Sequence, residues 1–367
     1  MKTFEHFRFS NGVVLRNPLV LAPMTTYSGN KDLTVSDEEI AYYTLRSKTL
    51  GMVITAAACV SKNGQAFDNQ MGMYDRKFLS GLKALAGAIK KAGSKAVIQL
   101  HHGGRMNAPH LYENPEDIVA PSAVKALREG APKPRALTIE EIHQLIEDFK
   151  QATALAIEAG FDGVELHGAN TYLLQQFFSP HSNRRTDQYG GSLENRMRFI
   201  VELVDGVSEV IAKEAVNPFI LGYRFSPEEI EEPGISLEDT LALVERLKDK
   251  PLDYLHVSLR RYDQTSSRNK EDKTPIATHL QTVLNHKVPL IGVGDISSYE
   301  DIEKAKALGF DLYALGTIAL SDPQIGISIL SSSASKEFRA ETMPSALYER
   351  MKKSAQYFES KGYTYKT

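Results

Sequence analysis

Residues 138–166 read TIEEIHQLIEDFKQATALAIEAGFDGVEL and contain one complete helix–strand unit. Thr138 stands three residues before Glu141, and this spacing lets the two side chains satisfy free N–H groups at a helix start. Gly160 suits the left-handed conformation that often ends a helix. The short apolar run 163–166 that follows is typical of a buried strand. The stretch therefore predicts a helix that leads directly into a strand.

The same unit recurs on both sides of this stretch. Further pairs of a hydroxyl and an acid indicate helix starts at Ser36 and Glu39, Ser236 and Asp239, and Ser298 and Asp301, and further glycines indicate helix ends at Gly51, Gly93 and Gly309. Seven more apolar runs accompany the first, at residues 19–22, 52–55, 96–100, 219–223, 254–257, 289–293 and 312–315. Eight alternations of strand and helix predict an α/β fold, the (β/α)8 TIM barrel. A doubly wound sheet is the structural alternative, but its G-x-G-x-x-G fingerprint after the first strand is missing.

Two segments depart from this alternation of strands and helices. Residues 101–137 carry five prolines where a few residues would close the loop. Long loops in compact domains are usually functional, so we expect a lid or substrate wall at the carboxyl end of strand three. The segment 331–367, with an apolar period over 347–358, predicts closing helices packed on the barrel. We expect a single domain over residues 1–367, with the barrel at about 15–330.

Composition excludes several classes of protein. The 367 residues are 42% hydrophobic and carry 43 basic and 46 acidic side chains, for a net charge of −3. The sequence has no cluster of basic residues of the kind that binds nucleic acid. Its apolar runs are too short to span a membrane. Cys59 is the single cysteine and is expected to be a small buried hydrophobe. A cytoplasmic enzyme with a small-molecule substrate, no nucleic-acid partner and no membrane partner is the expectation.

Polar residues gather directly after the predicted strands. His167, Asn170 and Tyr172 follow strand four and supply two donors for one oxygen and a phenol, which suits polarising a carbonyl and delivering a proton. An alternative is a divalent metal site, because Glu165 and His167 share one face of the strand with His101 and His102 nearby. That arrangement would indicate a metal-dependent lyase or hydrolase.

Four segments resemble the old yellow enzyme family of FMN-dependent ene-reductases. They are Leu21-Ala22-Pro23-Met24-Thr25, residues 99–105 (QLHHGGR), residues 167–172 (HGANTY), and Phe178-Ser179-Pro180 with residues 183–196 (NRRTDQYGGSLENR). The last run is the longest and most specific. Its own role is expected to be structural, with a turn at Gly190-Gly191, a helix cap at Ser192 and an ion-pair network of Asp187 with Arg185 and Arg196.

The resemblance implies an FMN cofactor and assigns contacts to it. The implied cofactor-binding residues are Ala22, Pro23, Met24, Thr25, Ala57, Gln99, Arg224, Gly294, Gly316 and Thr317. Arg224 would lie beside N1 and O2 of the flavin, where its permanent charge favours the anionic reduced ring. Many relatives carry arginine directly after the glycine where this chain has Thr317. A phosphate contact would then have to come from another cation, for which Arg260 and Arg261 are candidates.

The resemblance also implies the reaction. NADH or NADPH reduces FMN, and hydride then passes to Cβ of an activated alkene such as an enone, enal or nitroalkene, or to a quinone. His167 and Asn170 would bind the substrate oxygen, Tyr27 would form a further wall, and Tyr172 would protonate Cα. The resemblance allows a homo-oligomer, and the remaining alternative is a flavin-binding protein with little turnover.

Overall fold

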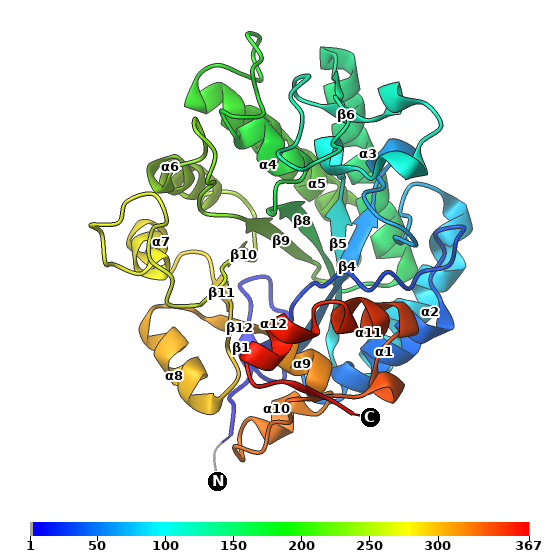
Figure 1. Cartoon of the computed structure of the whole chain (residues 1–367), viewed down its shortest axis with the longest axis vertical. Helices are drawn as coiled ribbons and strands as arrows, with labels where there is room; N and C mark the ends of the chain where they lie inside the picture. The colour runs from blue at the N-terminus through cyan, green and yellow to red at the C-terminus, as the bar shows by residue number, and fades with distance from the viewer. Residues whose placement is uncertain (1–2, 367) are drawn as a thin grey trace.

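The computed structural model describes residues 3–366 and contains a closed barrel of eight parallel strands. Around the barrel the order is β3-β4-β5-β8-β9-β10-β11-β12, and pairing of β12 with β3 closes it. The strands are β3 (Leu19–Leu21), β4 (Met52–Cys59), β5 (Lys95–His101), β8 (Gly163–Gly168), β9 (Ile220–Phe225), β10 (Tyr254–Val257), β11 (Leu290–Val293) and β12 (Leu312–Leu315). Each of the eight predicted runs overlaps one of these strands, and the TIM barrel is confirmed (Figure 1).

Helices surround this barrel. Those that follow the barrel strands are α1 (Asp37–Ser47), α2 (Leu79–Ala92), α3 (Ile139–Ala159), α4 (Leu173–Phe178), α5 (Leu193–Glu214), α6 (Leu237–Leu247), α7 (Ile276–Leu284), α8 (Tyr299–Ala307), α9 (Thr317–Ser321) and α10 (Ile325–Ser328). Their apolar faces pack on the outer faces of the strands and form the large outer core. Among the described residues, no helix is both long and apolar enough to cross a bilayer.

The predicted helix boundaries are confirmed with one exception. Ser36, Thr138, Ser236 and Ser298 each cap a helix start with the side chain, and Gly93 and Gly160 end α2 and α3 at positive φ. The prediction of a helix end at Gly51 was wrong, because α1 ends at Ser47 with Lys48 as its C-cap. A Cβ at Gly51 would stand 2.0 Å from the carbonyl oxygen of Asn17, so close backbone approach explains this glycine.

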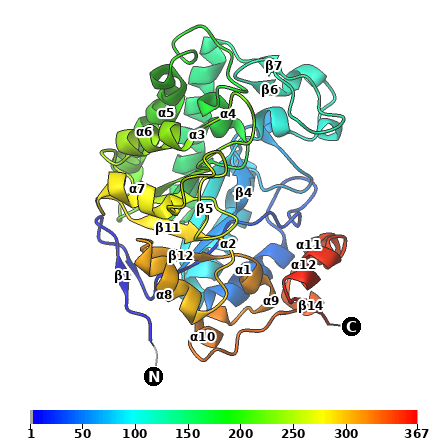
Figure 2. The same cartoon turned by 60° about the vertical axis from the view of Figure 1, so that its left-hand side comes forward.

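An N-terminal hairpin closes the end of the barrel at which the strands begin. Strands β1 (Phe7–Arg8) and β2 (Val14–Leu15) pair antiparallel, and Phe9 and Leu15 are buried among residues that point into the barrel, including Val20 and Tyr254. In Figure 2 this hairpin lies on the left of the molecule. Its apolar side chains extend the inner core, so the functional face must lie at the other end.

Two segments cover that other end. The loop after β5 contains three short 3₁₀ turns and a small parallel sheet of β6 (Val119–Ala120) and β7 (Arg135–Ala136). The C-terminal segment contains α11 (Ser345–Lys352) and α12 (Ala355–Ser360), with β13 (Glu337–Phe338) paired to β14 (Thr364–Tyr365). Both segments lie on the right in Figure 2, and the predicted helical stretch 347–358 is two helices interrupted at 353–354.

The longest family-like run acts structurally, as expected, with one difference. Arg185 pairs with Asp187 at 2.6 Å, and Ser192 caps α5. Arg196 does not join that pair. Its guanidinium instead donates to the carbonyl of Phe178 and lies 3.6 Å from Asp239, because α5 faces α6 at that position.

Candidate active site

Tyr172 and two histidines form an aromatic cluster at the carboxyl ends of β5 and β8. The Tyr172 ring lies edge-on to His101 at 4.3 Å between centroids, and 5.3 Å from His167. Burial lowers the pKa of His101 to about 3 and that of His167 well below its ordinary value. Both imidazoles are therefore neutral at physiological pH, and each can donate one N–H.

A buried charge pair lies beneath the cluster. Glu165 is fully buried, and its carboxylate accepts hydrogen bonds from Gln99 at 2.7 Å, His256 at 2.8 Å and Tyr254 at 3.1 Å. Burial opposes its ionisation, but His256 and Arg224 together lower the pKa of Glu165. Arg224 is directly paired in register with His167 on β8 and His256 on β10. A permanent cation and a carboxylate thus share the dry interior of the barrel.

The Arg224 guanidinium uses only some of its hydrogen-bond donors with the described residues around it. Its Nη2 donates to Ser258 at 3.2 Å, and its buried Nε has no hydrogen-bond partner among the described residues. Ser258 in turn donates to the amide oxygen of Asn170 at 3.0 Å. A guanidinium can only donate, so the hydroxyl proton of Ser258 must point to Asn170. Among residues 3–366 the amide NH₂ of Asn170 has no hydrogen-bond partner, so it is available to a ligand.

Asn170 itself lies on a sharply turned loop. Asn170 and Thr171 have φ of 57° and 68°, and the Asn170 N–H donates to the hydroxyl of Ser226 at 2.9 Å. Two successive left-handed residues turn the chain at the end of β8, so that Tyr172 returns to the histidine cluster. Such uncommon backbone conformations concentrate at functional sites.

Aromatic side chains form one wall of the mouth. Tyr27 lies 5.5 Å from Phe67, and Phe67 lies 6.3 Å from His101. Arg350 of α11 stacks over the Tyr27 ring at 3.7 Å. Tyr27 was singled out from the sequence, whereas Phe67 and Arg350 were missed because their proximity depends on the tertiary fold.

The end of β3 brings its predicted residues to the same face. Ala22 and Pro23 are buried, Met24 and Thr25 are half-buried, and the Ala22 N–H donates to Leu315 on β12 at 3.0 Å. The neighbouring Thr26 donates to buried Glu39 at 2.6 Å, which ties this turn to α1. On β4, Ala57 stands where the pairing with β5 shifts register and resumes opposite Gln99.

Among the described residues, three of the four proposed metal ligands make other hydrogen-bond contacts, and the exception is His167. Glu165 is held as described above, and Nδ1 of His101 lies 3.0 Å from the amide of Gln70. His102 accepts from the Gly104 N–H. Within residues 3–366, no group of three or more His, Cys, Asp or Glu side chains is arranged to hold a metal ion.

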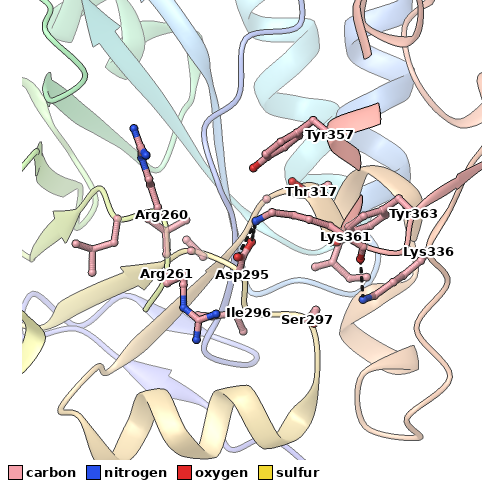
Figure 3. Close-up of a pocket in the computed structure, with 16 residues that line it drawn as sticks. Arg260, Arg261, Asp295, Ile296, Ser297, Thr317, Lys336, Tyr357, Lys361 and Tyr363 are labelled. Atoms are coloured by element: carbon pink, nitrogen blue, oxygen red, sulfur yellow. Dashed lines mark hydrogen bonds and ion pairs between the residues drawn. The ribbon is translucent and has the colours of Figure 1, made fainter. Parts of the chain in front are cut away.

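The ends of β11 and β12 border a cavity of about 590 Å³. Gly294, Gly316 and Thr317 line it with Arg260 and Arg261, as the sequence suggested (Figure 3). A Cβ at Gly316 would meet nothing nearer than Met24 Sδ at 3.8 Å, so there is open space beside this glycine. The other side of the cavity was not foreseen, since it consists of Lys336, Tyr357, Lys361 and Tyr363 from the C-terminal segment.

The sequence is similar to known flavin oxidoreductases over most of its length. The sequence profile of the NADH:flavin oxidoreductase / NADH oxidase family matches residues 2–333. The probable NADH-dependent flavin oxidoreductase YqiG of Bacillus subtilis is 44% identical over 326 residues, which cover 89% of this chain and 87% of that protein. The NADH:fumarate oxidoreductase of Klebsiella pneumoniae is 41% identical over 95% of this chain, but the match spans only 38% of that longer protein.

A solved structure agrees with these matches. The old yellow enzyme homologue from Zymomonas mobilis has a TM-score of 0.77 and 25% identity, over 91% of this chain and 93% of that one. The barrel fold is therefore shared. The chain belongs to the NADH:flavin oxidoreductase / NADH oxidase family, together with the old yellow enzyme homologues, and works with FMN and with NADH or NADPH.

Proposed function

We propose that the protein uses NADH or NADPH to reduce an activated alkene, such as an enone, enal or nitroalkene, or a quinone. The observation that carries this proposal is the placement of Tyr172 against His101 and His167, next to the relay from Arg224 to Asn170. It combines donors for a carbonyl or nitro oxygen with a phenol that can supply a proton.

The residues present fit FMN. Bound FMN would accept a hydride from the nicotinamide and pass it to the substrate. The buried Nε of Arg224 has no partner within the described part of the chain. The Gln99 Nε2 is held by Glu165, so the Gln99 amide oxygen is left as an acceptor. A donor and an acceptor of this kind suit the pyrimidine edge of a flavin. We propose that Arg224 and Gln99 hold that edge, with Ala22, Pro23, Met24, Thr25 and Ala57 around the ring.

His167 and Asn170 would hold the substrate oxygen. His167 is neutral, and its buried Nδ1 has no partner among residues 3–366. The Ser258 hydroxyl fixes the oxygen of Asn170, so the free NH₂ group would point at the substrate. Two neutral donors bind a carbonyl oxygen without protonating it, and they stabilise the negative charge that develops there during reduction.

Tyr172 would deliver the proton to Cα. Burial raises the pKa of its phenol, so the hydroxyl stays protonated at neutral pH. Tyr27 and Phe67 would keep bulk water away from the same region. The half-buried phenol therefore meets the two requirements of a general acid, which are a retained proton and access to the substrate.

Anaerobic mixing tests the proposal. The FMN-loaded protein is first reduced with NADH or NADPH, and the reduced protein is then mixed with cyclohexenone, a nitroalkene or a quinone while flavin absorbance is followed. Reoxidation by these acceptors, with a saturated product from the alkenes, is the expected result. Reduction by nicotinamide without reoxidation by any of them would instead identify a flavin-binding protein with little turnover.

A further inference from the structure

The C-terminal segment, residues 334–366, forms one side of the cavity that opens at Gly316 and Thr317. Four of its side chains, which we call the C-terminal clamp, line this cavity: Lys336, Tyr357, Lys361 and Tyr363. All four lie beyond residue 333, where the family match ends. Figure 3 shows Lys361 extending into the cavity toward the loop after β11.

The clamp is built on a small aromatic core. Phe338 is fully buried and stacks on Tyr363 at 5.1 Å, with Phe358 5.4 Å away. Lys336 precedes β13 and Lys361 follows α12, and the ammonium of Lys336 donates to the Lys361 carbonyl at 3.5 Å. The two cations are therefore positioned by the same packed unit and stand on the same side of the cavity.

The charge around the cavity is positive. Arg260, Arg261, Lys336 and Lys361 face it with a single acidic side chain, Asp295. Arg261 is largely neutralised by Asp263 at 2.8 Å, and Asp295 pairs with Lys361 at 2.7 Å. Lys336 and Arg260 have no carboxylate within ion-pair distance among the described residues, so the cavity keeps net positive charge.

Thr317 supplies no positive charge to the cavity. It stands where the family resemblance implied an arginine, and its short hydroxyl side chain supplies no charge. A phosphomonoester carries a charge of about −1.5 to −2 at pH 7, and a lysine ammonium binds it as a point charge. Lys361 reaches the loop after β11 from the opposite wall, where it pairs with Asp295, and it lines the same cavity as Thr317.

We propose that the C-terminal clamp completes the FMN site, with Lys361 and Lys336 binding the phosphate of the cofactor in place of the arginine that Thr317 replaces. The proposal rests on FMN as the cofactor and is independent of which substrate accepts the hydride. Asp295 holds Lys361 over the cavity, and the phosphate joins this pair as a second anionic partner, with Lys336 and Arg260 balancing the added charge.

Riboflavin gives a direct test, because it shares the ring and ribityl chain of FMN and lacks the phosphate. The deflavinated full-length protein and its Lys361→Gln, Lys336→Gln and double variants would be titrated with each flavin, and Kd read from fluorescence quenching. Lys353→Gln is the matched control, since Lys353 is an exposed lysine of the same segment outside the cavity. Thermal unfolding of each deflavinated variant checks that the fold is retained.

The expected result is specific to the phosphate. Each single substitution should raise the Kd for FMN about tenfold, and the double substitution should raise it further, while the Kd for riboflavin changes less than about twofold. Raising the salt concentration should weaken FMN binding more in the parent than in the double variant. An unchanged Kd for FMN in the double variant, or an equal loss for both flavins, would overturn the proposal. Failure of the parent to bind either flavin would instead contradict the cofactor itself.

Discussion

The Tyr172 ring meets His101 edge-on at 4.3 Å, and this contact fixes the direction in which the phenol enters the mouth of the barrel. His101 ends β5, and Tyr172 follows the turned loop at the end of β8, so two neighbouring strands define the position of one hydroxyl. Removing that hydroxyl would therefore reveal its role without moving the ring.

Tyr172→Phe should separate the two halves of the reaction. General acids contribute about 10²- to 10⁴-fold, so enone reduction should fall by a factor in that range while flavin reduction by nicotinamide keeps its rate. Quinones need no proton on carbon and should still reoxidise the variant. Anaerobic stopped-flow measures both halves. Tyr313→Phe, which removes a phenol hydroxyl bound to the Phe310 carbonyl, is the control. Equal loss in both halves would point to disturbed flavin binding.

Arg224→Met should lower the two-electron potential of the bound flavin and weaken FMN retention. One charged hydrogen bond is worth about 1.5–3 kcal/mol. For a two-electron couple this corresponds to a shift of about 30–60 mV. Dye-coupled reductive titration measures the potential. Arg196→Met removes a cation of similar burial from α5, outside the barrel, and should leave the potential unchanged. A parent-like potential in Arg224→Met would show that another group stabilises the reduced ring.

Ser258→Ala should weaken substrate binding without slowing flavin reduction. The substitution removes the hydroxyl that receives a hydrogen bond from Arg224 and orients Asn170. A hydrogen bond of about 0.5–1.5 kcal/mol predicts a rise in KM for enones of about 2- to 10-fold. Ser258→Thr keeps the hydroxyl and should restore much of the binding. If Ser258→Ala has parent KM and kcat, the relay has no role in holding the substrate.

Glu39 should make the fold less stable as pH rises. Burial raises its pKa to about 7 despite the hydrogen bond from Thr26, and its Oε2 has no partner in the described part of the chain. The folded state therefore holds a proton that the unfolded state releases near pH 4.5. Stability is highest below that pH and declines up to about pH 7, by about 3 kcal/mol in total.

Glu39→Gln is the matching test, because the amide keeps the shape of the protonated acid. Urea unfolding at pH 5 and pH 8 should show a smaller decline in the variant, which should be more stable than the parent at pH 8. Glu209→Gln changes an exposed carboxylate on α5 and serves as the control. The same decline in Glu39→Gln and in the parent would assign the pH dependence to another group.

Local chemistry made most of the barrel predictable. The caps at Thr138 and Ser298 and the glycine at 160 act within one turn of chain, so the sequence alone determines them. Gly51 was misassigned because its constraint comes from Asn17, which is distant in sequence. Arg196 was misassigned for a similar reason, since its partner Asp239 lies on another helix.

The site was predictable only in part for the same reason. Residues at strand ends, such as His167 and Arg224, could be placed because strand ends in a parallel barrel share one face. The roles of Phe67, Arg350 and the C-terminal clamp depend on long segments returning to that face. No spacing rule in the sequence encodes such a return.

The N-terminal hairpin has a consequence for how this protein can change over time. Phe9 and Leu15 plug the barrel floor and contribute to its durability, yet they lie at the opposite end from every group proposed to meet a substrate. Mutations in the loops at the mouth of the barrel can therefore change which substrates accept the hydride, while the hairpin at the other end continues to stabilise the fold. The residues that stabilise the fold and the residues proposed to contact the substrate thus lie at opposite ends of the barrel, so the second group can change without altering the first.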